Sequence, residues 1–109
     1  MRFELRAVPA WITDCNCSVC RRICGLWAHG DRDDITISRA PDATIAYVWG
    51  DRTLARHTCR TCGCTTHWES LQPEVSRRMA VNLRMAEPEA IKSIRVRRFD
   101  GADTWVYLD

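Results

Sequence analysis

Apolar and polar residues alternate along several short stretches of the chain. Near the N-terminus Phe3, Leu5 and Ala7 alternate with charged or polar neighbours, and the same period of two recurs over residues 35–38 and 79–83. Because successive side chains of a β-strand point to opposite faces, this period predicts short strands with one buried face.

A β-hairpin is predicted over residues 44–58. The stretch 44–49 is rich in β-branched and aromatic residues, Gly50 and Asp51 follow it, and a second strand-like stretch covers residues 53–58. Strands joined by a short glycine-containing turn are typical of hairpins. The second strand would deliver Cys59 to its end.

Helical signals are few. Residues 69–78 contain Pro73 and lack a sustained apolar stripe, so we expect at most one or two helical turns there. Residues 87–91 predict one short helix with Pro88 at its first position. The pattern as a whole predicts a mainly β fold of short antiparallel strands.

Length and charge limit the classes of function. The chain has 109 residues without a dividing linker, so we expect a single domain over residues 1–109. The net charge is +2 and the basic residues are spread along the chain, which disfavours nucleic acid or a membrane as the main partner. The N-terminus has no apolar run typical of a signal peptide or membrane span, so we expect a cytoplasmic protein with reduced thiols.

Seven cysteines form two tight clusters, and the odd number and close spacing favour metal ligation over disulfides. Cys15, Cys17 and Cys20 form a C-x-C-x-x-C motif. Thiolates one and three residues apart on a turn can converge on one zinc ion with little loss of chain entropy. Three protein ligands leave one coordination position open, as catalytic zinc sites do.

Cys24 is the nearest candidate for a fourth ligand, which would make the site a closed, structural one. The chain would have to fold back within residues 21–24 to bring it there. We therefore expect Cys24 to pack in the core, where small free cysteines are common.

The second cluster resembles a zinc knuckle. It begins with Cys59, Cys62 and Gly63, and glycine suits the tight reversal beneath a metal because it reaches positive φ without steric cost. The knuckle supplies two ligands. Cys64, His57 and His67 are candidates for the others, although for each histidine the favoured interpretation is a strand residue at the surface or one with a hydrogen-bonded partner in the core. His29 has no clustered partner and fits the same structural reading.

Each of several other residues near the clusters has two possible roles, one functional and one structural. Arg21 and Arg22 follow the cysteine turn and could pair with substrate carboxylates or form a solvated surface pair. Trp27 and Trp68 could wall a pocket or belong to the core. Residues 100–105 predict a tight turn with a role in folding.

Four segments in sequence resemble the glutathione-dependent formaldehyde-activating enzyme and centromere protein V family. They are Cys15–Arg22, His57–Gly63, Val81–Arg84 and Phe99–Trp105. The resemblance implies a mainly β, Mss4-like or β-tent fold with zinc-binding turns. It also implies that Cys15, Cys17 and Cys20 hold a catalytic zinc, and that Cys59 and Cys62 supply half of a structural site.

The chain departs from that family at its N-terminus, where the usual C-x-C-G segment does not precede residues 2–5. The second zinc site is therefore expected to be weak or empty, and we expect one or two Zn²⁺ ions per chain.

The three-cysteine site suits thiol chemistry. Zn²⁺ with three thiolates has a net charge of −1, which weakens activation of water but permits exchange of the open position for a thiol. Together with the resemblance, this predicts a carbon–sulfur lyase-type enzyme, like S-(hydroxymethyl)glutathione synthase. It would act on adducts of glutathione or another small thiol with formaldehyde or a related aldehyde. The alternative is a non-catalytic zinc-binding module for protein or nucleic-acid interaction.

Overall fold

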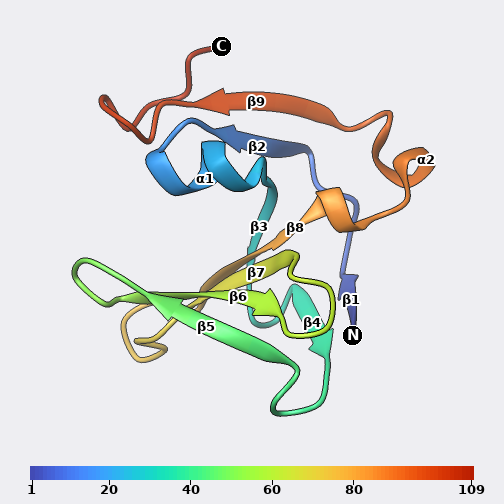
Figure 1. Cartoon of the computed structure of the whole chain (residues 1–109). Helices are drawn as coiled ribbons and strands as arrows, with labels where there is room; N and C mark the ends of the chain where they lie inside the picture. The colour runs from blue at the N-terminus through green and yellow to red at the C-terminus, as the bar shows by residue number, and fades with distance from the viewer. The chain divides into compact units, whose positions relative to one another are not determined.

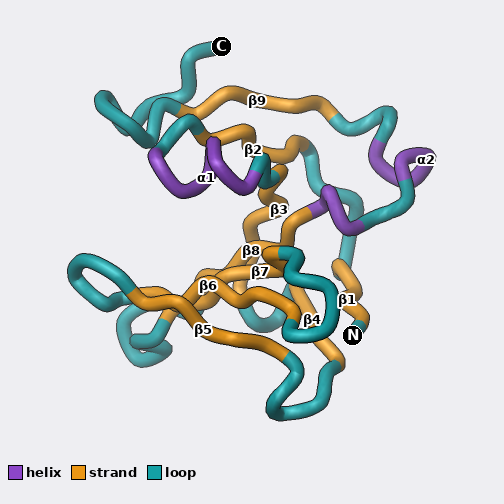
Figure 2. Tube along the Cα trace, viewed as in Figure 1, coloured by secondary structure: helices purple, strands orange, loops and turns teal.

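The computed structural model describes residues 1–109 and is mainly β, as the sequence predicts, with 43% strand and 12% helix. Short strands are joined by turns, and helices are few and brief (Figures 1 and 2). The strands are β1 (Arg2–Leu5), β2 (Trp11–Cys15), β3 (Leu26–Asp31), β4 (Ile35–Ser38), β5 (Thr44–Val48), β6 (Leu54–Cys59), β7 (Thr65–Ser70), β8 (Arg78–Asn82) and β9 (Arg95–Phe99). The helices are α1 (Ser18–Ile23), the 3₁₀ helix η1 (Leu83–Met85) and α2 (Pro88–Ile91). None of them combines the length and apolar character needed to span a membrane.

The chain forms two compact units, each assembled from two separate stretches. The first unit comprises Met1–Val8 and His29–Val81, and the second comprises Pro9–Ala28 and Asn82–Asp109. Two of the three boundaries between them fall inside β3 and β8, and the third lies in the loop between β1 and β2. The expectation of one domain over residues 1–109 stays a prediction.

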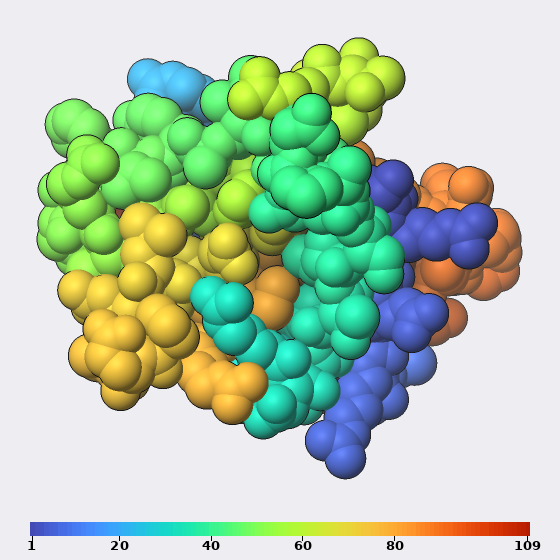
Figure 3. Space-filling view, turned by 90° about the horizontal axis from the view of Figure 1, so that it is seen from below, coloured from blue at the N-terminus to red at the C-terminus, as the bar shows by residue number.

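The predicted hairpin is present in the first unit. β5 pairs antiparallel with β6, and β6 pairs antiparallel with β7. Gly50 in the connecting turn has φ +68°, a backbone conformation that glycine adopts without strain. Cys59 ends β6, as expected from the sequence. The hairpin, green in Figure 3, forms part of the surface. A separate antiparallel pair of strands consists of β1 and β4.

β8 differs from its prediction. Alternation over residues 79–83 predicts one buried face, whereas Met79, Ala80, Val81 and Asn82 are all buried. Leu83 lies beyond the strand, in η1. Such a continuous buried run is typical of a strand that is covered on both faces.

In the second unit β2 lies between β3 and β9. β2 pairs antiparallel with β3 and parallel with β9, where Cys15 lies opposite Phe99. The parallel pair departs from the expected all-antiparallel arrangement, because β9 comes from the distant C-terminal part of the chain. α2 begins at Pro88 as predicted, and residues 69–78 contain no helix.

Buried apolar side chains fill the second unit, among them Ile12, Leu26 and Trp27. The side-chain oxygen of the buried Asn82 accepts hydrogen bonds from Leu26 N at 3.0 Å and Arg84 N at 3.1 Å. Asn82 thereby caps η1 and holds it against β3, which satisfies a polar side chain that would be costly to bury alone.

Candidate metal centre

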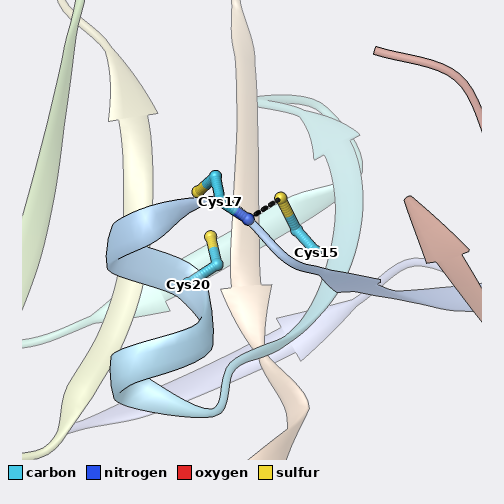
Figure 4. A group of neighbouring side chains, drawn as sticks. All are labelled: Cys15, Cys17 and Cys20. Carbon is cyan, nitrogen blue, oxygen red and sulfur yellow. Dashed lines mark hydrogen bonds between the residues drawn. The ribbon is translucent and has the colours of Figure 1, made fainter. Parts of the chain in front are cut away.

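The three cysteines of the first cluster lie where β2 turns into α1. Cys15 ends β2, Cys17 is the N-cap of α1, and Cys20 lies one turn further along the helix. Arg21 N donates to Cys17 O at 3.0 Å, which closes the first helical turn. The three sulfur atoms all lie within 4.8 Å of one another, at the start of α1 (Figure 4).

This arrangement fits a metal ion. Tetrahedral zinc with Zn–S bonds of about 2.3 Å places its sulfur ligands roughly 3.8 Å apart. The observed cluster needs only small side-chain movements to reach that geometry. No fourth histidine, cysteine or carboxylate joins the group. The site can therefore hold a metal through three thiolates, although the donor set alone does not specify which metal.

The thiols of this turn influence one another strongly. The Cys20 thiol donates a hydrogen bond to Cys15, and together with the backbone N–H of Cys17 this lowers the pKa of Cys15 to about 5, against the opposing effect of burial. The same bond to Cys15, followed by burial, raises the pKa of Cys20. Without a metal, the cluster thus shares protons around one thiolate, and a bound cation would take the place of those protons.

Trp27 supports the cluster from the core. Its indole Nε1 donates to the Cys20 sulfur at 3.3 Å, and the side chain is 2% exposed. The core reading of Trp27 is therefore correct. The sequence did not predict its hydrogen bond to sulfur, because the bond depends on the approach of β3 to α1. Such a donor orients the sulfur toward the cluster.

Gly101 lies against the cysteine turn. A Cβ atom at this position would lie 2.6 Å from the Cys15 sulfur and 3.3 Å from the Cys17 Cβ. The first distance is shorter than any ordinary contact, so a side chain here would displace Cys15. Glycine is needed at position 101 because the backbone passes so close to the sulfur.

Asn16 ties the cysteine turn to the C-terminal turn. Its Nδ2 donates to Asp100 Oδ1 at 2.9 Å, and its Oδ1 accepts from Ala102 N at 3.0 Å. The bond from Asn16, followed by those from Thr104, lowers the pKa of Asp100. Residues 100–105, which the sequence assigned to folding alone, also brace the candidate metal centre. No local sequence signal pairs residues 84 positions apart.

Cys24 is not a core residue, contrary to the prediction. It is the exposed C-cap of α1, with φ +53°, and its sulfur donates to Arg21 O at 3.6 Å. The prediction failed because it did not include α1, whose end places this side chain at the surface. Cys24 is also outside the group of neighbouring sulfurs, so the candidate site consists of three cysteines.

The second cluster adopts the expected knuckle turn in the first unit. Gly63 has φ +76°, and its N–H donates to Cys59 O at 2.9 Å, while Cys59 N donates to Cys64 O at 2.8 Å. The backbone N–H of Cys62 lowers the pKa of Cys59, and the side chain of Cys62 raises the pKa of Cys64. These neighbouring thiols could also hold a metal ion.

His57 and His67 are structural residues of the core. They stack with ring centroids 4.2 Å apart, and both are buried. The Nδ1 of His57 lies 2.8 Å from Thr44 Oγ1 and its Nε2 lies 3.1 Å from Glu69 Oε1, so both ring nitrogens already have partners. For His57 the reading as a hydrogen-bonded core histidine is therefore correct.

The remaining candidates lie at or near the surface. His29 is exposed on β3, and its ring meets Trp68 edge to face at 5.8 Å. Arg21 and Arg22 are exposed on α1, where Arg22 Nη1 donates to Ser18 O at 2.8 Å. Their pairing with substrate carboxylates stays a prediction.

Comparison with known proteins gives one similar structure. A scan against protein-family models finds no match, and a search of the curated proteins finds none either. A crystal structure of a Rhodobacter sphaeroides protein matches at 28% identity with a TM-score of 0.65, covering 85% of this chain and 86% of that one. The similarity supports a shared fold over most of both chains.

Proposed function

We propose that the protein is a zinc-dependent enzyme of the carbon–sulfur lyase type. It acts on adducts of glutathione or another small thiol with formaldehyde or a related aldehyde. The observation that carries this proposal is the convergence of Cys15, Cys17 and Cys20 within 4.8 Å on one turn, with no fourth protein ligand in the group.

The donor set favours thiol chemistry over hydrolysis. Cys15, Cys17 and Cys20 would hold the zinc ion, which would supply a cation able to stabilise an incoming thiol as thiolate, the form that reacts with carbonyl carbon. The chain itself holds the ion through three sulfurs and places the Trp27 N–H against Cys20. That donor partly offsets the negative charge that three thiolates concentrate in the site.

The reaction balances without a further reagent. A sulfur–carbon bond forms between the thiol and the aldehyde carbon, the carbonyl π electrons move to oxygen, and the thiol proton ends on that oxygen. The reverse reaction breaks the same bond and releases thiol and aldehyde. Three thiolate ligands require a reducing environment, which agrees with the proposed cytoplasmic location.

A cobalt-substituted protein tests the open position. Glutathione titrated into the Co²⁺ form should change its visible spectrum as a fourth sulfur enters, and the zinc form should accelerate exchange between free formaldehyde and its glutathione adduct, measured by ¹³C NMR. Cys20→Ser should abolish both signals. Cys24→Ser, the matched control, should leave both unchanged because Cys24 lies outside the cluster.

Two results would contradict the proposal. An unchanged cobalt spectrum at saturating glutathione would show that the position is not available to a thiol. Tight zinc binding without any acceleration of adduct exchange would leave the second candidate, a non-catalytic zinc-binding module.

A further inference from the structure

We propose that the second unit carries a binding pocket for a small carboxylate with an apolar body. The pocket goes beyond the function proposed for the cysteine turn, because none of its lining residues is a cysteine. Its lining residues come from β2, β3, β9, η1, α2 and the loops beside α2.

The pocket wall is predominantly apolar. Ile12 and Leu26 belong to the buried core, whereas Val96 on β9 remains 47% exposed although it lines the same cavity. Ile91 and Ile94 contribute further aliphatic surface from α2 and the turn that follows it. An incompletely covered aliphatic wall gains free energy from any apolar group that displaces water from it.

The size fits a small molecule. The cavity has a volume of about 350 Å³. A dry protein cavity of about 150 Å³ already accommodates benzene, and ligand pockets start at about 300 Å³. The cavity therefore has room for a chain of several carbon atoms or one substituted ring.

The charged residues of the lining are Arg84 and Lys92, and no acidic residue lines the pocket. Arg84 is held in place, because its Nε donates to Cys24 O at 3.1 Å. That bond uses the inner nitrogen of the guanidinium and leaves both terminal nitrogens without a protein acceptor. An anchored guanidinium with two free donors matches the two oxygens of a carboxylate.

Lys92 has a secondary role. Its Nζ already forms an ion pair with Glu89 Oε2 at 2.6 Å, whereas the Arg84 guanidinium has no acidic partner. Arg84 is therefore the residue that selects an anion, and the aliphatic wall receives the apolar body. The positive charge of the lining disfavours cationic ligands. A neutral ligand would bind only through its contacts with the aliphatic wall.

The test compares three probes of one shape on the zinc-loaded full chain, namely hexanoate, hexan-1-ol and hexylammonium. Titrations followed by ¹H–¹⁵N NMR should show saturable shifts at residues 84–96 and at Ile12 and Leu26. Hexanoate should bind at least about tenfold more tightly than hexan-1-ol, and hexylammonium should bind most weakly. This ranking needs no variant, so it does not depend on whether an altered protein folds.

Variants then assign the selectivity to one residue. Arg84→Met should reduce hexanoate binding to the level of hexan-1-ol and leave the alcohol unchanged, whereas Val96→Trp should fill the cavity and weaken both. Arg21→Met removes an exposed arginine outside the pocket and should change neither. Equal binding of the three probes, shifts centred away from residues 84–96, Ile12 and Leu26, or an Arg84→Met protein that keeps the preference for hexanoate would each overturn the proposal.

Discussion

Gly101 shows how a single hydrogen atom in place of a side chain shapes the candidate metal centre. A methyl group at this position would meet the Cys15 sulfur at 2.6 Å. Gly101→Ala should therefore push Cys15 out of the cluster and weaken zinc binding about tenfold to a hundredfold, the range for residues that orient metal ligands. Competition with a chromophoric chelator measures the affinity.

The control for this substitution is Ala102→Ser in the same exposed turn. Ala102 contributes its backbone N–H to Asn16, which serine retains. It should bind zinc as the unaltered protein does. If Gly101→Ala also retained full affinity, the close approach of residue 101 to Cys15 would have no bearing on the site.

His67 makes the stability of the first unit depend on pH. Burial lowers the pKa of His67 to about 4, whereas an unfolded histidine titrates near 6.5. Between these values the unfolded chain binds a proton that the folded chain does not, so stability falls as the pH falls from 6.5 towards 4. The slope contributed by one such group is at most about 1.4 kcal/mol per pH unit.

Urea unfolding over this pH range, in excess chelator so that metal binding does not contribute, measures the effect. His67→Gln should reduce the slope, because glutamine does not titrate, even if it lowers the stability at pH 7. A variant with the same slope as the unaltered protein would show that His67 is not the group responsible.

At the scale of elements, the turn from β2 to α1 depends on the C-terminal turn beside it. Asn16 forms both of its side-chain hydrogen bonds with that turn. Hydrogen bonds this exposed contribute modestly, because water competes for the same donors and acceptors. Asn16→Ala should therefore release zinc about threefold to tenfold faster, since it frees the backbone between two ligands without removing either.

Stopped-flow transfer of zinc to a chelator measures this rate. Asp103→Asn, an exposed change in the same turn that leaves the Asn16 contacts intact, is the matched control. An unchanged rate for Asn16→Ala would assign residues 100–105 to folding alone.

At the scale of the whole molecule, one sheet edge is open to other chains. β5 ends the strand order of the first unit, and its stretch contains no charge and no proline. Ile45 and Tyr47 on this strand are 53% and 52% exposed, and Trp49, directly after it, is 75% exposed. Uncharged, apolar edge strands favour pairing between molecules, and lysine on such an edge opposes it.

Tyr47→Lys should therefore reduce concentration-dependent association, measured by sedimentation velocity. Val75→Lys replaces an even more exposed apolar side chain, at 77% exposure, in a loop outside the β5 edge, and should have little effect. If both lysine variants reduced association equally, net charge and not the β5 edge would be the cause.

The sequence by itself determined the local features of this protein. The period of two predicted the mainly β fold, the residues around Gly50 predicted the hairpin, and Pro88 predicted the start of α2. The close spacing of Cys15, Cys17 and Cys20 predicted their convergence, because residues this near in the chain meet on any tight turn. Gly63 likewise predicted the knuckle turn.

Only the tertiary structure decided which distant residues support those features. Gly101, Trp27 and Asp100 reach the cysteine turn through the pairing of β2 with β3 and β9, a long-range arrangement that no local pattern encodes. Cys24 lies at the surface because α1 ends there in a left-handed conformation. Short-range spacing specifies which atoms can converge, whereas the pairing of distant strands specifies what surrounds them.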